Sequence, residues 1–118
     1  MRETAEPEVI AALRPVLERV ARTGGTITYR DLAVAAGVGA PHSIHRTTLG
    51  LEALMREDHA AGRPLLAAVA VGKAGCPRPG FFYVLAELGR YDGPVEGPEA
   101  VGQHDRELAA TRAAFGRA

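Results

Sequence analysis

The chain has 118 residues, 47% hydrophobic and 24% charged, a composition typical of a globular domain long enough to bury its own core. Its fourteen basic and fourteen acidic residues cancel, which argues against a protein that binds nucleic acid avidly and without regard to sequence. A single cysteine excludes an internal disulfide, and the lack of a long apolar run or a signal-peptide pattern predicts a cytoplasmic protein without membrane contact.

The first predicted element is a helix over about residues 7–22. Pro7 suits its first turn, where the missing N–H costs nothing. Apolar residues then recur at helical spacing and make one inward face, namely Val9, Leu13, Val16, Leu17 and Val20. Pro15 interrupts this pattern, so we expect a kink or a split near Leu13.

The next stretch predicts a helix-turn-helix. Residues 26–28 are β-branched and favour a short strand. Apolar spacing predicts a helix over 29–36 that ends at Gly37, and Pro41 is placed to open a second helix over 41–60. Two helices joined by a tight turn that contains glycine form a helix-turn-helix.

The second helix of this unit has two distinct faces. Its inward face is predicted to contain Ile44, Thr48, Leu51 and Met55, flanked by Leu54. Its other face points toward solvent or a ligand and contains His42, Ser43, His45, Arg46 and Leu49. Gly50 costs roughly 1 kcal/mol in a helix interior, so something should pack closely against it. We favour another helix over a nucleic-acid backbone.

The second half of the chain begins with an uninterrupted apolar run over 65–71, which predicts a buried strand. A turn-rich loop with Lys73 and Arg78 follows over 72–80. Residues 81–88 suit a return strand or a helix, and we favour the helix slightly. The last predicted helix covers 98–115, with Val101, Leu108 and Phe115 facing inward.

This order of elements predicts an α+β, mostly α fold, a winged helix-turn-helix with an added C-terminal helix. We expect one domain over 1–118, with a core at about 7–90 and an extension over 91–118. Residues 25–33 read Gly-Thr-Ile-Thr-Tyr-Arg-Asp-Leu-Ala. This segment resembles the Gly-x-x-Thr-Tyr-x-x-Leu/Ile-Ala segment in the DNA-binding domain of alkylguanine-DNA alkyltransferases and their alkyltransferase-like relatives.

The resemblance covers about residues 9–85 and implies DNA binding through this unit. Those proteins flip a base toward a Pro-Cys-His-Arg-Val strand after the recognition helix. Here Pro64 is followed by Leu65 and Leu66, and Cys76 lies in a loop about ten residues later. Alkyl transfer is therefore not predicted, and the fold analogy alone does not confer that activity.

Other chemistry has little support in the pattern. His42 and His45 are three residues apart, but no cysteine or carboxylate shows the spacing of a metal site. Cys76 has Lys73 and Arg78 nearby and no identifiable base. We therefore predict a non-enzymatic protein with no catalytic residue, no metal and no other cofactor.

The sequence favours a regulatory protein that binds double-stranded DNA. Arg46 would read guanine, while His42, Ser43 and His45 would contact bases or phosphates. Arg30, Lys73 and Arg78 would hold phosphates. The alternative is a winged helix used for contact with a protein partner, without DNA binding. A homodimer through the first or last helix is a further expectation.

Overall fold

The computed structural model describes residues 4–116 and confirms a mostly helical α+β fold. The helices are α1 (Pro7–Thr23), α2 (Tyr29–Ala35), α3 (Ser43–Ala60), α4 (Pro79–Glu87) and α5 (Pro98–Phe115). A 3₁₀ turn, η1 (Leu66–Val69), and two short strands, β1 (Ile27–Thr28) and β2 (Ala70–Val71), join them. No helix in the described part of the chain is long and apolar enough to cross a membrane.

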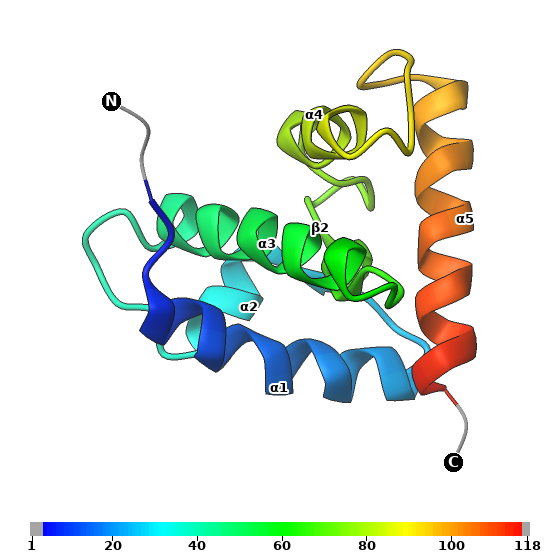
Figure 1. Ribbon diagram of the computed structural model, residues 1–118. Coiled ribbons are helices and arrows are strands. Elements are labelled where there is room, and N and C mark those ends of the chain that lie inside the picture. Colours follow the sequence, from blue (N-terminus) through cyan, green and yellow to red (C-terminus); the bar gives the residue numbers. More distant parts are fainter. Residues whose placement is uncertain (1–3, 117–118) are drawn as a thin grey trace.

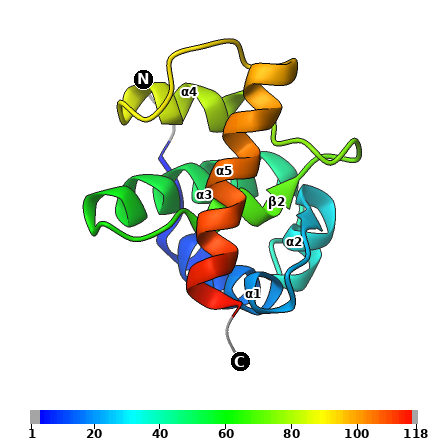
Figure 2. The same cartoon turned by 90° about the vertical axis from the view of Figure 1, so that its right-hand side faces the viewer.

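Helices α1 and α3 run side by side in the same direction, and α5 stands across their C-terminal ends (Figure 1). The view turned by 90° shows α5 in front of both (Figure 2). The pair is close because Gly50 lies where α3 meets α1. A Cβ atom at Gly50 would lie 2.7 Å from Leu13 Cδ1 and 3.1 Å from Val9 Cγ1. The prediction that another helix packs against Gly50 is therefore confirmed.

Helix α1 has the inward face that the sequence predicts, because Val9, Leu13, Val16 and Leu17 are buried and Val20 is partly buried. Of the kink or split expected near Leu13, the split is wrong. The helix continues through Pro15, whose ring is exposed on the side away from the core. The buried residues on both sides of the proline hold the helix together despite the missing backbone hydrogen bond.

The two predicted helices are present as α2 and α3, and residues 36–42 join them. Thr28 caps α2, because its hydroxyl accepts a hydrogen bond of 3.1 Å from the Asp31 N–H. The expectation that Pro41 opens the second helix is wrong, since α3 begins at Ser43. His42 has a left-handed conformation with φ of 56°, and its carbonyl accepts the first helical hydrogen bond, from the Arg46 N–H at 2.9 Å.

The apolar run over 65–71 is buried as expected, but a strand over its whole length is wrong. Residues 66–69 form η1, and only Ala70 and Val71 form a strand, β2. The turn forms because the buried Asp58 carboxylate accepts a hydrogen bond of 3.2 Å from the Leu66 N–H. An apolar run alone does not distinguish a strand from a turn of helix.

Strand β2 pairs in parallel with β1, Ile27 opposite Ala70 and Thr28 opposite Val71. The loop 72–78 and helix α4 follow β2, so the described residues contain no antiparallel hairpin of the kind that forms a wing. The helical alternative for residues 81–88 is confirmed. The last helix is also confirmed over 98–115, and it contributes Ala100 and Leu108 to the common core.

The inward face of α5 agrees with the prediction at Leu108 and Phe115, which pack against the core, and differs from it at Val101. Val101 is 43% exposed, and Ala100 takes the inward position beside it. The buried stripe then continues with polar residues that bind the η1 segment. The His104 Nε2 lies 2.8 Å from the Ala68 carbonyl oxygen, and the Thr111 hydroxyl donates a 2.7 Å hydrogen bond to the Leu65 carbonyl. The apolar pattern of the sequence did not predict that buried polar side chains on α5 bind the η1 segment.

Candidate nucleic-acid interface

Arg78 lies beside the exposed face of α3 and is fixed by two side chains. Its backbone N–H donates a 2.7 Å hydrogen bond to the Tyr29 hydroxyl, and its guanidinium carbon lies 5.5 Å from the centre of the Tyr29 ring. Its Nη1 donates to the Thr48 hydroxyl at 3.2 Å. Within the described residues no carboxylate pairs with Arg78, so its charge stays available to an anion.

Tyr29 and Thr48 were not among the predicted site residues. Tyr29 is 8% exposed, and burial raises the pKa of its phenol, so the ring stays neutral in solution near pH 7. Thr48 donates its own hydroxyl proton to the Ile44 carbonyl at 2.9 Å, which leaves the oxygen as an acceptor for Arg78. Tyr29 belongs to the Thr-Tyr motif of residues 28–29, but nothing in that motif indicates a contact with residue 78.

Arg30 and Lys73 provide two further exposed cations, from α2 and from loop 72–78. Neither forms an ion pair with a carboxylate in the described part of the chain. Arg30 directly follows Tyr29, and Lys73 lies in the loop that ends at Arg78. These three cations were predicted to bind phosphates, and the Tyr29–Arg78 contact joins α2 to the end of this loop.

Arg46 has a different environment. Its Nε and Nη2 bind the two Glu6 carboxylate oxygens at 2.6 and 2.9 Å, and its Nη1 donates to the Gly39 carbonyl at 2.7 Å. The ion pair lowers the pKa of Glu6. The guanidinium edge that would contact guanine is therefore already occupied. Arg46 and Thr48 are two positions apart on a helix and face different sides, so the structure does not bring Arg46 together with Arg78.

His42, Ser43 and His45 lie at the N-terminus of α3, as predicted. His42 and His45 are exposed, and Ser43 is half-buried as the first residue of the helix. The N-cap residue, His42, makes no side-chain hydrogen bond to the first turn of the helix. The positive end of the helix dipole favours a phosphate oxygen at such a position.

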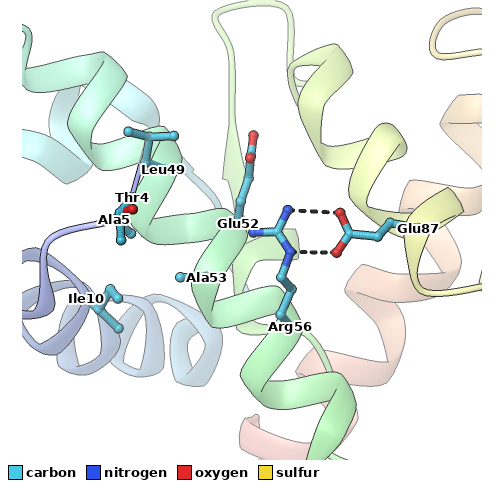
Figure 3. Close-up of a pocket in the computed structure, with 8 residues that line it drawn as sticks. All are labelled: Thr4, Ala5, Ile10, Leu49, Glu52, Ala53, Arg56 and Glu87. Atoms are coloured by element: carbon cyan, nitrogen blue, oxygen red, sulfur yellow. Dashed lines mark hydrogen bonds and ion pairs between the residues drawn. The ribbon is translucent and has the colours of Figure 1, made fainter. Parts of the chain in front are cut away.

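The C-terminal half of the exposed face of α3 borders a groove of about 620 Å³. Figure 3 shows Arg56 on α3 joined to Glu87 on α4 by two hydrogen bonds, of 2.7 and 3.0 Å. Glu52 lies one turn earlier on α3 and extends away from this pair (Figure 3). Burial raises the pKa of the Glu52 carboxyl, an effect that Arg56 partly opposes.

This groove limits where a polyanion can bind. The charge of Arg56 is balanced by Glu87, and Glu52 adds a carboxylate to the same face. The carboxylates of Glu52 and Glu87 therefore make this groove unfavourable for a polyanion. The sequence contains the Glu52–Arg56 spacing typical of a helical ion pair, but the partner that Arg56 binds lies on another helix.

The remaining candidates do not converge on a reaction centre. The Nδ1 atom of His59 lies 3.2 Å from Arg90 Nη1, next to the Arg90–Glu107 ion pair, and away from the N-terminus of α3. Residues 4–116 contain no group of three metal-ligating side chains close enough to hold an ion. Cys76 is exposed in loop 72–78.

Comparison of the chain with models of known families, with curated proteins and with solved structures finds no match. A functional proposal consequently depends on the charges and contacts described above.

Proposed function

We propose that this chain is a non-enzymatic, regulatory protein that binds double-stranded DNA through α2 and α3. In this proposal α2 and α3 form a helix-turn-helix, and loop 72–78 takes the place of a wing in a reduced winged-helix arrangement. The observation that carries the proposal is Arg78, an exposed cation without a carboxylate partner in the described chain, fixed against α3 by Tyr29 and Thr48.

The first turns of α3 would enter the major groove, as in other helix-turn-helix proteins. His42, Ser43 and His45 would lie nearest to the bases, and the positive end of the helix dipole would favour a phosphate beside them. Arg30, Lys73 and Arg78 would bind phosphates along the flanking backbone. Arg46 would position the helix, because it joins α3 to the Glu6 carboxylate and to the Gly39 carbonyl.

A salt titration tests this proposal. Binding to a random 20-base-pair duplex is measured by fluorescence anisotropy over a range of salt concentrations. The triple variant Arg30→Ala, Lys73→Ala, Arg78→Ala should bind every sequence more weakly than the wild-type protein. The slope of log affinity against log salt should fall by about 0.9 for each phosphate that the variant no longer neutralises.

A matched control removes three exposed arginines elsewhere, as Arg19→Ala, Arg22→Ala and Arg106→Ala, with the same change in net charge. This control should keep most of the wild-type affinity and slope. Equal decreases in both triple variants would show that only net charge matters. An absence of salt-dependent binding by the wild-type protein would reject the proposal.

The second candidate function is contact with a protein partner without DNA binding. Zero net charge and the neutralisation of Arg46 by Glu6 favour it, because both reduce the positive surface available to DNA. It becomes the leading interpretation if the titration shows no affinity for duplex DNA. Pairing of two copies through α1 or α5 stays a prediction that sedimentation analysis tests.

A further inference from the structure

The carboxylate of Glu52 shares its place in the fold with the fixed cation Arg78. Glu52 follows Thr48 by four residues on α3, so the two side chains lie on one face of the helix, about one turn apart. Thr48 is the residue whose hydroxyl accepts the hydrogen bond from Arg78 Nη1. Glu52, Thr48, Arg78 and Tyr29 all line one small cavity between α2, α3 and the start of α4. A negative charge therefore borders the site that would hold a phosphate.

Gly80 shows independently where this carboxylate lies. A Cβ atom at Gly80 would lie 2.7 Å from Glu52 Oε2, so the carboxylate reaches the first turn of α4. Gly80 follows Arg78 by two residues, and Arg78 is the N-cap residue of that helix. The carboxylate thus lies against the backbone that carries Arg78, in the space that the absence of a side chain at Gly80 leaves open.

Neither of the two charges is neutralised by an ion pair. Within residues 4–116, Glu52 forms no hydrogen bond or salt bridge, and Arg78 has no carboxylate partner. Arg56 lies one turn after Glu52 on α3, but it binds Glu87 through two hydrogen bonds of 2.7 and 3.0 Å (Figure 3). The site consequently presents a cation that attracts phosphate and, beside it, a carboxylate that repels phosphate.

This repulsion acts on every duplex in the same way. Like charges a few ångströms apart weaken binding by about fivefold even in water, and Glu52 is partly buried, where salt screens its charge less. All duplexes carry the same phosphates, whereas the contacts to bases differ from one sequence to another. A repulsive group that all ligands meet therefore favours the ligands that gain further contacts elsewhere.

We propose that Glu52 is a specificity-determining residue, which limits the binding of DNA of arbitrary sequence by repelling the phosphate held at Arg78. Duplexes then bind tightly only where the first turns of α3 add contacts to bases. This inference rests on the proposed DNA binding and names the group that keeps this binding selective. The zero net charge of the chain fits a protein that avoids binding without regard to sequence.

The charge of Glu52 can be removed with little change of shape. Binding of the full-length wild-type protein and of Glu52→Gln to the same random duplex is measured by fluorescence anisotropy, at low salt, where weak binding is detectable. Glu52→Gln should bind about threefold to fivefold more tightly. Glu18→Gln is the matched control, because it changes net charge equally on the outer side of α1, beside Pro15. The control should change the affinity by less than about twofold.

Arg78 identifies how Glu52 acts. If Glu52 repels the phosphate at Arg78, Glu52→Gln should gain little affinity in an Arg78→Ala background, where no phosphate is held at this position. The gain should then fall to that of Glu18→Gln. A gain that Arg78→Ala leaves unchanged would overturn the inference, because Glu52 would then act through net charge or through stability alone. Circular dichroism and urea unfolding establish that each variant is folded, and Glu52→Ala provides the same test with a second side chain.

Failure of this inference is distinguishable from failure of the proposed function. Equal affinities of the wild-type protein and Glu52→Gln, with both bound to DNA, would overturn the role of Glu52 and leave DNA binding intact. An absence of binding by the wild-type protein would reject the proposed function, and this inference with it.

Discussion

Gly50→Ala measures how closely α1 and α3 pack. Alanine in place of a helical glycine contributes about 1 kcal/mol of stability in the absence of contacts. At Gly50 the new methyl carbon would lie 2.7 Å from Leu13 Cδ1, whereas carbon atoms prefer about 3.5–4.0 Å. Leu13 is fully buried and Val9 is 5% exposed, so neither side chain has solvent to move into.

Forcing a methyl group into a packed core costs about 1–3 kcal/mol. Set against the helical gain of about 1 kcal/mol, the net effect of Gly50→Ala is a loss of up to about 2 kcal/mol. Gly102→Ala in α5 is the matched control, because its nearest neighbour would be Arg106 Nη1 at 3.6 Å, an ordinary contact. Gly102→Ala should therefore increase the free energy of unfolding by close to the full amount, about 1 kcal/mol, that alanine contributes over glycine in a helix.

The assay is equilibrium unfolding in urea with m-values compared between variants. The free energies of unfolding of the two alanine variants should differ by about 1–3 kcal/mol. This difference measures the cost of packing alone, because both variants gain the same helix propensity. Adding Leu13→Ala to Gly50→Ala should cost less than Leu13→Ala costs alone, by about 0.5–3 kcal/mol. If Gly50→Ala stabilises the protein as much as Gly102→Ala does, the close approach of the two helices is wrong.

Three further predictions concern charged groups. Burial raises the pKa of Glu52, so the folded protein loses stability as the pH rises through that pKa. Glu52→Gln should therefore be more stable than the wild type at pH 7, and this difference in stability should disappear well below pH 4.5, the ordinary pKa of the group. A difference that is constant with pH would contradict this prediction. Asp58→Ala should lower the free energy of unfolding by about 3 kcal/mol, because the buried carboxylate binds Arg14, Arg63 and the Leu66 N–H. Glu57→Ala removes only an exposed ion pair with Arg14 and should lower it by less than about 1 kcal/mol. Urea unfolding compares the two variants, and similar losses of stability would contradict the special role of Asp58. Arg46→Ala should lower thermal stability and leave the salt slope of DNA binding unchanged, because Glu6 already neutralises this cation. A decrease in the salt slope as large as that caused by Arg78→Ala would instead support the base contact predicted from the sequence.

Local patterns in the sequence predicted most of the helices. Pro7 at the start of α1 and the apolar spacing before Gly37 in α2 are local signals, so their effect is visible without knowledge of the fold. The start of α3 was misplaced by two residues because His42 has a left-handed conformation that only a few non-glycine residues take up. Element boundaries of this kind depend on a single backbone angle.

Long-range contacts account for the differences between prediction and structure. Arg46 binds Glu6, and Arg78 binds Tyr29 and Thr48, across separations of 30 residues or more. Segment 66–69 forms a turn because Asp58 binds its first N–H, although its apolar residues are equally suited to a strand. The apolar composition of that segment predicted its burial correctly, whereas the partners of these side chains required the folded chain.

The way in which Arg78 is fixed affects the entropy of complex formation. A free arginine side chain loses up to about 2 kcal/mol of rotamer freedom when it is immobilised. The Tyr29 ring and the Thr48 hydroxyl already impose this loss in the unbound protein, so the cost falls on folding rather than on association. In the proposed complex Lys73, which lies exposed between two glycines of its loop, would lose its freedom on binding. Arg78 would by contrast be preorganised for a phosphate, so Tyr29 and Thr48 would contribute to affinity without touching the ligand.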